Sequence, residues 1–258
     1  MCDYTPDKII FFKTNRKNPP FYMGFEYEFD VKKNCNDIWD SFYCEVKKDS
    51  FLKSINNKLQ NVFYLQYDDT ADLELTSMPF SWEFYKKKLK SFTEVFKYID
   101  KYRVKAVRDT GFHVHVSKTF FTYGFYEKCL QFLFNNEKFF KLISGRDNCS
   151  LENYASITLL ANNLENISYS PLNKNSLMKT DYEDEKFAAI RATTKTVEFR
   201  LFKGANDINM IHAYLEFWVA FLSYLKIDDN PTTAKFVKYI CKNYKLACYL
   251  IQKRLKRR

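Results

Sequence analysis

Polar and apolar residues alternate strictly in three short segments of the chain, which is the pattern of a β-strand with one polar and one apolar face. The segments are FEYEF at 25–29, FHVHV at 112–116 and VEFRL at 197–201. Each segment carries two chemically active side chains at positions i and i+2. We therefore expect three strands, each with one face that carries chemistry. The pairs are Glu26 with Glu28, His113 with His115, and Glu198 with Arg200.

Other short runs rich in β-branched and aromatic residues predict additional strands. One run covers 62–67 and is followed by a turn at 68–70 and a second run over 73–76. Another covers 187–191, and residues 192–195 can join it in a hairpin to the segment at 196–202.

Apolar residues at steps of three and four predict helices between these strands. The clearest helix begins at Ser81, a typical capping residue, and continues through Ile99 with a lysine-rich outer side. The other expected helices cover 35–60 with unclear ends, 123–143 up to a stop at Gly145, a segment from Asp207, and a last segment from Pro231 into the basic C-terminal tail.

The segment 146–185 has weak periodicity and is rich in Asn, Ser and acidic residues, so we expect a long functional loop or lid there. A chain of 258 residues is long enough to bury a sizeable core. We expect an N-terminal arm over 1–20 and one domain over 21–258. If the alternating strands lie in one sheet in register, their functional groups share a face and amphipathic helices cover the other.

The chain carries 41 Lys and Arg residues against 31 Asp and Glu residues, a net charge of +10. This balance favours anionic partners such as nucleotides, nucleic acid or acidic peptides. No apolar run is long enough to cross a membrane and no signal peptide is recognisable, so we expect a cytoplasmic protein without membrane contact. The seven cysteines are scattered and form no C-x-x-C pair, which predicts reduced thiols.

Two carboxylates side by side on a strand face repel each other unless water or a cation screens them. Strands that are half exposed to water would explain any one of the pairs, but three pairs together favour a cation. Carboxylates and imidazoles together suit Mg²⁺ or Mn²⁺. Asp68 and Glu74 join this surface if the strand that ends at Thr76 lies beside it. His212 falls in an apolar helix and is interpreted as a core or boundary residue.

Five motifs follow one another along the chain: GFEYEF at 24–29, YDDT at 67–70, ELTSMP at 74–79, GFHVHV at 111–116 and TVEFRLF at 196–202. In this order they resemble the motifs of the amidoligase family, whose catalytic fold is similar to that of glutamine synthetase and glutamate-cysteine ligase. The resemblance spans residues 24–204. It implies an α+β fold with a curved, largely antiparallel sheet, a polar concave catalytic face and helices on the other face.

The resemblance also implies an activity, which is ATP-dependent joining of a carboxylate to an amine through an acyl phosphate, with Mg²⁺ or Mn²⁺ held by the sheet. Phosphoryl transfer passes through a charge-rich transition state that metals and an arginine stabilise by electrostatics. The substrates would be ATP and an acid and an amine that the sequence does not identify. The expected catalytic residues are Arg200, His115 and Glu198.

The resemblance assigns binding roles by position. The implied metal ligands are Glu26, Glu28, Asp68, Glu74, His113 and Glu198. Of His113 and His115, one would bind metal and the other would face phosphate or substrate. Arg146 and Arg191, together with Arg200, are candidates for contacts with phosphate or with a substrate carboxylate, although the first two are equally ordinary as surface or ion-pair residues.

Several alternatives stay open. The turn at 67–70 reads Asp-Asp-Thr where the family usually has Asp-Gly-Ser, so Asp69 or Asp72 could substitute for Asp68. A metal-dependent phosphodiesterase or nuclease would also use acidic residues, histidines and a basic surface. A third hypothesis is a non-catalytic binder of nucleic acid or peptide on the same scaffold. The basic run 253–258 is interpreted as a solvated tail, with nucleic acid as a less favoured partner.

Overall fold

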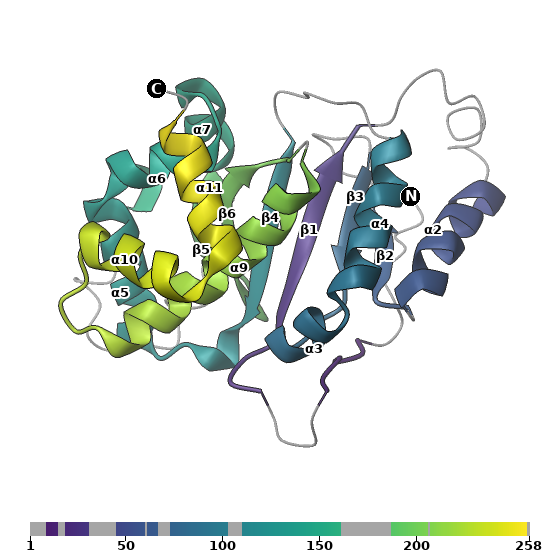
Figure 1. Cartoon of the computed structure of the whole chain (residues 1–258), viewed down its shortest axis with the longest axis horizontal. Coiled ribbons are helices and arrows are strands. Elements are labelled where there is room, and N and C mark those ends of the chain that lie inside the picture. Colours follow the sequence, from purple (N-terminus) through teal and green to yellow (C-terminus); the bar gives the residue numbers. More distant parts are fainter. Residues whose placement is uncertain are drawn as a thin grey trace. The chain divides into compact units, whose positions relative to one another are not determined.

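The predicted strands and helices are distributed over two compact units, residues 1–111 and residues 112–258. The computed structural model describes residues 9–14, 19–30, 45–59, 61–66, 73–102, 110–160, 187–205 and 207–256. Both units combine antiparallel strands with helices, so the chain has the mixed helix and sheet composition of an α+β protein (Figure 1). The single domain over 21–258 and the likeness to glutamine synthetase stay predictions.

In its described part, unit 1 contains β1 (Met23–Phe29), α2 (Glu45–Leu59), β2 (Phe63–Gln66), β3 (Leu73–Ser77), α3 (Trp82–Lys87) and α4 (Leu89–Tyr102). Strand β3 lies between β2 and β1 and pairs antiparallel with both. These strands confirm the predictions at 25–29, 62–67 and 73–76. The register sets Glu28 opposite Glu74 and Glu26 opposite Thr76.

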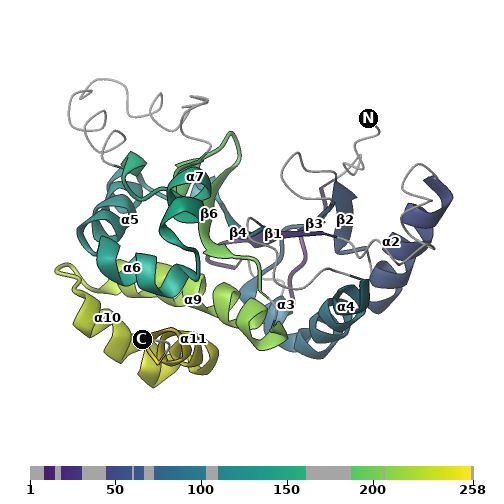
Figure 2. The same cartoon turned by 90° about the horizontal axis from the view of Figure 1, so that it is seen from above.

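Aromatic side chains form the core of unit 1. Phe25 contacts Phe92 and Phe96 of α4, with ring centroids 6.4 and 5.7 Å apart. Tyr27 contacts Phe96 as well, with centroids 6.3 Å apart. Helix α4 therefore covers the apolar face of β1, as Figure 2 shows, and the glutamates of β1 point to the other face.

In its described part, unit 2 contains β4 (Gly111–Ser117), η1 (Lys118–Phe120), α5 (Tyr123–Asn135), α6 (Glu137–Ser144), α7 (Asn148–Tyr154), β5 (Ile190–Ala192), β6 (Thr196–Lys203), α9 (Ile208–Ile227), α10 (Thr233–Asn243) and α11 (Lys245–Leu255). The first residue of β4, Gly111, is also the last residue of unit 1. Strand β6 lies between β4 and β5. The antiparallel β5–β6 pair confirms the predicted hairpin.

Helix α9 is the centre of unit 2. Its Trp218 packs against Phe199 of β6 with ring centroids 4.5 Å apart, and its Tyr214 stacks on Phe202 at 4.2 Å. Because Phe199 and Phe202 are three residues apart, the strict alternation of β6 ends between them. Helices α10 and α11 pack on the side of α9 away from β6 (Figure 2). In the described part of the chain, no helix is long and apolar enough to cross a membrane.

The predicted start and stop signals of the helices are confirmed at three positions. The Ser81 hydroxyl accepts a hydrogen bond from the backbone N–H of Phe84 (3.1 Å) at the start of α3. Asp207 accepts one from the N–H of Asn209 (2.9 Å) at the start of α9. Gly145 follows α6 in the left-handed conformation, with φ 77°. Local capping chemistry therefore sets these helix ends.

Three helices that were expected to be continuous are each interrupted, so these predictions are wrong. The break between α3 and α4 falls at Lys88 (φ −102°, ψ 12°), and the break between α5 and α6 falls at Asn136 (φ −119°, ψ 29°). The last helix is divided into α10 and α11 at Tyr244 (φ −136°, ψ 94°). At each break a single residue has dihedral angles outside the helical range. None of these residues is Gly or Pro, so the sequence does not indicate the break.

The loop expected over 146–185 is also wrong in part. Helix α7 occupies residues 148–154 of that segment, and the Asp147 carboxylate caps it by accepting from the N–H of Ser150 (2.8 Å). Two turns are too few for a clear periodicity, which is why the pattern missed this helix. Residues 161–186 lie outside the described residues.

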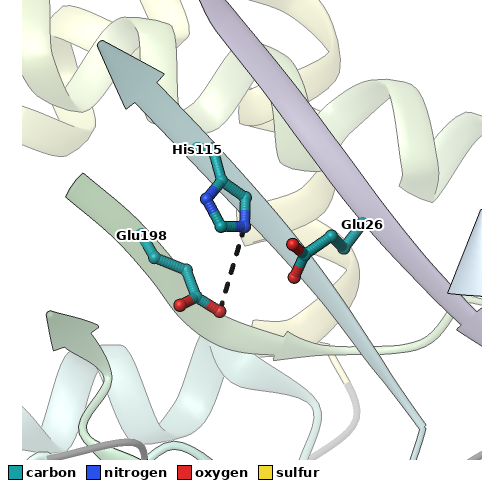
Figure 3. A group of neighbouring side chains, drawn as sticks. All are labelled: Glu26, His115 and Glu198. Atoms are coloured by element: carbon teal, nitrogen blue, oxygen red, sulfur yellow. Dashed lines mark ion pairs between the residues drawn. The ribbon is translucent and has the colours of Figure 1, made fainter. Parts of the chain in front are cut away.

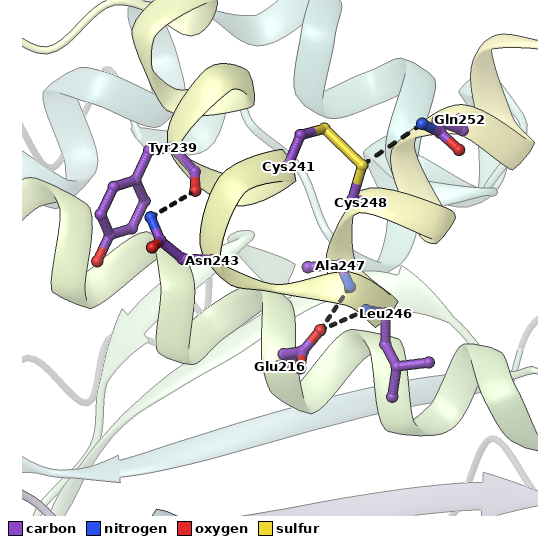
Figure 4. The surroundings of a disulfide bond; sticks show 8 residues. All are labelled: Glu216, Tyr239, Cys241, Asn243, Leu246, Ala247, Cys248 and Gln252. Atoms are coloured by element: carbon purple, nitrogen blue, oxygen red, sulfur yellow. Dashed lines mark hydrogen bonds between the residues drawn. A yellow bond between two sulfur atoms is a disulfide. The ribbon is translucent and has the colours of Figure 1, made fainter.

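The expectation of reduced cysteines is wrong for Cys241 and Cys248, which form a disulfide between α10 and α11 (Figure 4). Their spacing of seven residues is not a recognised pairing motif, and only the turn at Tyr244 brings them together. The free cysteines of the described residues are Cys129, which is buried, and Cys149, which is exposed.

The conformation of Gly145 generates a stability prediction. An added Cβ at this left-handed residue would be strained and would collide with the guanidinium of Arg254, whose Nη2 donates to the hydroxyl of Tyr214 (3.1 Å). We expect Gly145→Ala to lower the free energy of unfolding by about 1–2 kcal/mol in urea denaturation.

Gly124→Ala is the matched control. Gly124 lies in α5, and an added Cβ there has no atom within 4 Å. This substitution should leave the free energy of unfolding unchanged or raise it by about 0.5–1 kcal/mol. Equal losses in the two variants would contradict the role given to Gly145.

Candidate functional site

A fully buried carboxylate, Glu198, is the centre of the polar face of unit 2. Arg191 is its cross-strand partner in the β5–β6 register, and the Nε of Arg191 donates to Oε2 of Glu198. Arg200, two residues further along β6, donates from Nη1 to Oε1 of Glu198 (2.6 Å). Alternation along β6 and register across the hairpin thus place the three side chains on one face.

The two histidines of β4 lie beside the same carboxylate. Nδ1 of His113 is 3.4 Å from Oε1 of Glu198, and Nε2 of His115 is 4.0 Å from it. Figure 3 shows His115 and Glu198 pointing toward each other from β4 and β6. Nδ1 of His115 also forms a hydrogen bond with the hydroxyl of Thr196 (2.9 Å). The structure therefore brings together the histidine pair and the Glu198–Arg200 pair, as the alternation predicted.

The charge of this cluster favours an anion. Two guanidinium groups share one carboxylate, so Glu198, Arg191 and Arg200 together carry a net positive charge even with neutral histidines. The side chains of Arg191 and Arg200 are 30% and 15% exposed, so solvent reaches both. Guanidinium groups bind phosphate and carboxylate through paired N–H groups. The cluster also offers an imidazole and a carboxylate that could take part in holding a metal ion.

An acidic face lies on the strands of unit 1. Glu28 and Glu74 are register partners in β1 and β3, so their side chains point to the same side, and they are only 4% and 7% exposed. Oε2 of Glu28 accepts a hydrogen bond from the backbone N–H of Gly111, the first residue of β4. Oε1 of Glu74 accepts one from the hydroxyl of Thr76 (2.6 Å). Glu26, opposite Thr76 and half-buried, shares this face.

Tyr64 of β2 belongs to the acidic face and was not predicted from the sequence. Burial, reinforced by the negative charges of Glu26 and Glu74, raises the pKa of Tyr64 to about 12. The phenol is therefore neutral at physiological pH and adds no negative charge. Its place opposite Thr76 follows from the β2–β3 register, which the sequence pattern alone does not provide.

The acidic face carries ligand types that suit a hard divalent cation. Three carboxylates and a hydroxyl offer oxygen ligands only, which Mg²⁺ and Mn²⁺ prefer. Like charges directly opposite each other in an antiparallel pair destabilise it, and a divalent cation between Glu28 and Glu74 would relieve this repulsion.

The remaining predicted residues are placed as follows. Arg146 is buried and donates to the hydroxyl of Ser150 (3.2 Å) and to the backbone carbonyl of Phe202 (3.3 Å), so its described contacts are internal to unit 2. Asp68 and its alternatives Asp69 and Asp72 lie outside the described residues. His212 is buried in α9, which confirms its interpretation as a core residue.

No protein-family model matches the chain, and no curated protein matches it.

The burial of Glu198 generates a prediction about stability. Glu198→Gln leaves two partly buried guanidinium groups without their carboxylate, which should lower the free energy of unfolding by roughly 3 kcal/mol in urea denaturation. Glu152→Gln is the matched control, because Glu152 is exposed and pairs with Lys141 at 3.1 Å on the surface of unit 2. That change should cost less than about 0.5 kcal/mol, and similar costs for both variants would refute the role of Glu198.

His212 generates a prediction about pH. Burial lowers the pKa of His212 from 6.5 to about 4 in the folded state, so the unfolded chain binds more protons between these pH values. Stability from the neutral histidine is therefore complete above pH 6.5 and is lost as the pH falls toward 4. Between pH 7 and pH 4 the wild type should lose roughly 3 kcal/mol more than His212→Leu in urea denaturation. Parallel losses in the two proteins would contradict this assignment.

Proposed function

We propose that the protein is an ATP-dependent ligase that joins a carboxylate to an amine. The observation that carries the proposal is the Glu198 cluster, in which a buried carboxylate orients two guanidinium groups and lies beside two imidazoles. Such a cluster suits a phosphate group that carries several negative charges. The order of the five motifs supports the choice of a ligase among the enzymes that handle phosphate.

In this proposal Arg200 and Arg191 bind and orient the phosphoryl group that is transferred. Both come from strands, and Glu198 fixes their direction before the substrate arrives, so little reorganisation is needed during reaction. His115 contacts phosphate or substrate while its ring is held by Thr196.

Glu26, Glu28 and Glu74 hold the divalent cation in this proposal. Bound Mg²⁺ or Mn²⁺ would neutralise phosphate charge. The chain contributes carboxylates that are held in place by hydrogen bonds. Glu28 accepts one from the backbone N–H of Gly111, and Glu74 accepts one from the hydroxyl of Thr76. Tyr64 lies near Glu26 and Glu74, and its raised pKa keeps the phenol neutral.

The proposal predicts separate losses of metal and nucleotide binding. Glu28→Gln should weaken Mn²⁺ binding at least tenfold in calorimetric titration, which is about 1.4 kcal/mol. Arg200→Lys should leave Mn²⁺ binding unchanged and weaken ATP binding at least tenfold, because an ammonium cannot replace a planar guanidinium. Glu94→Gln, which removes an exposed carboxylate from α4, is the matched control and should leave both affinities unchanged.

Activity is measured as ADP release with ATP, Mg²⁺, a mixture of amino acids as acids and hydroxylamine as a general amine. ADP should appear only when an acid and an amine are both present, and Glu28→Gln should abolish it. Cleavage of an oligonucleotide in Mn²⁺ without ATP would instead favour the phosphodiesterase hypothesis. Absence of both ADP release and metal binding would favour a non-catalytic binder.

A further inference from the structure

The positive charge of the chain is concentrated at its C-terminal end. Residues 231–258 contain nine of the 41 Lys and Arg residues and none of the 31 Asp and Glu residues. These 28 residues therefore account for +9 of the net charge of +10. Their described part forms α10 and α11, so most of this charge is displayed on a folded surface.

Four lysines of this region are exposed and available to a partner: Lys238 and Lys242 on α10, Lys245 at the start of α11 and Lys256 directly after it. In the described part of the chain, no carboxylate lies within 4.0 Å of their ammonium groups. We call these residues the four-lysine surface. The other basic residues of α10 and α11 are engaged: Lys235 with Asp228 at 3.6 Å, Lys253 with Asp207 at 2.6 Å, and Arg254 with the hydroxyl of Tyr214 at 3.1 Å.

The spacing of the four lysines suits an extended polyanion. Lys238 and Lys242 are one turn apart on one side of α10, about 6 Å along the helix. Lys245 and Lys256 are eleven residues apart, which returns to the same side of α11 about 16 Å further along. A nucleic-acid strand offers a phosphate every 3.4 Å of its rise, so one strand could reach both ammonium groups of either helix.

Two connections hold α11, one to α10 and one to α9. The disulfide of Cys241 and Cys248 joins the helices, and Oε2 of Glu216 in α9 accepts hydrogen bonds from the N–H groups of Leu246 (2.6 Å) and Ala247 (2.8 Å) (Figure 4). The lysines are therefore carried by a rigid support, which lowers the entropy lost on binding.

The apolar faces of these helices argue against a lipid surface as the partner. Phe236 and Ile240 of α10, and Leu250 and Ile251 of α11, are buried in the core of unit 2. Binding in a membrane interface requires such a face to insert among the acyl chains. Tyr249 and Leu255 are the large apolar side chains that α11 exposes, and they do not form a continuous apolar face.

We propose that the four-lysine surface binds the sugar-phosphate backbone of nucleic acid without reading its sequence. Each ammonium group that neutralises a phosphate releases a counterion, so binding weakens steeply with salt. The proposal is independent of the ligase activity, because it uses neither the Glu198 cluster nor the acidic face.

The test measures fluorescence anisotropy of labelled 20-nucleotide DNA and RNA strands between 50 and 200 mM NaCl. The protein is the full chain without ATP or metal, and the variant carries Lys238→Gln, Lys242→Gln, Lys245→Gln and Lys256→Gln. The slope of log K against log salt should shrink by about 3 in this variant, since each phosphate contact on a single strand contributes about 0.7. The dissociation constant at 100 mM NaCl should rise at least tenfold for every sequence tried.

The matched control removes the same charge elsewhere, by Lys86→Gln, Lys87→Gln, Lys90→Gln and Lys97→Gln on the exposed sides of α3 and α4. It should keep the wild-type slope within about 1. Equal weakening in both variants would show an effect of net charge alone and overturn the proposal. Failure of the wild type to bind either strand would overturn it too, as would tighter binding to phosphatidylserine vesicles or polyglutamate than to the oligonucleotides.

Discussion

The buried ion pairs of Glu198 are the interaction on which the polar face of unit 2 depends. A carboxylate without solvent exposure is costly unless charged donors surround it, and here the donors are Arg191 and Arg200. The same pairing holds both guanidinium groups in one direction. The interaction that makes the burial of Glu198 tolerable thus also orients the two guanidinium groups that we propose bind an anion.

In each unit, an alternating strand places aromatic side chains against a helix and charged side chains on the opposite face. In unit 1 the aromatic side of β1 packs on α4 and the other side carries glutamates, and in unit 2 Phe199 of β6 packs on Trp218 while Glu198 lies on the other side. The core of each unit therefore stabilises strands whose polar faces are costly by themselves. Such costly polar positions are expected where a protein binds a ligand.

Much of this arrangement could be predicted from the sequence because alternation and capping are local. The strands, the hairpin of β5 and β6, and the caps at Ser81, Asp207 and Gly145 all follow from neighbouring residues. What the sequence could not provide depends on contacts between distant residues or on single dihedral angles. The helix breaks at Lys88 and Asn136 belong to the second kind.

The candidate site divides in the same way. The i and i+2 spacing of polar residues in the alternating strands was enough to predict six site residues: Glu26, Glu28, His113, His115, Glu198 and Arg200. The pairing of Arg191 with Glu198 and the acidic surroundings of Tyr64 needed the strand registers, and the disulfide of Cys241 and Cys248 needed the turn between α10 and α11. Of the four-lysine surface, only Lys256 belongs to the run 253–258 that was interpreted as a tail. The other three lysines lie in the predicted last helix, and their sides could not be assigned because the sequence does not indicate the break at Tyr244.

The most direct test of the ligase account is a crystal structure of the full chain with Mn²⁺ and a non-hydrolysable ATP analogue, in which anomalous scattering locates the metal. The account predicts Mn²⁺ bound to carboxylate oxygens of Glu28 and Glu74, and a terminal phosphate bound to Arg191 and Arg200. Metal bound elsewhere, or a triphosphate that contacts neither arginine, would contradict it.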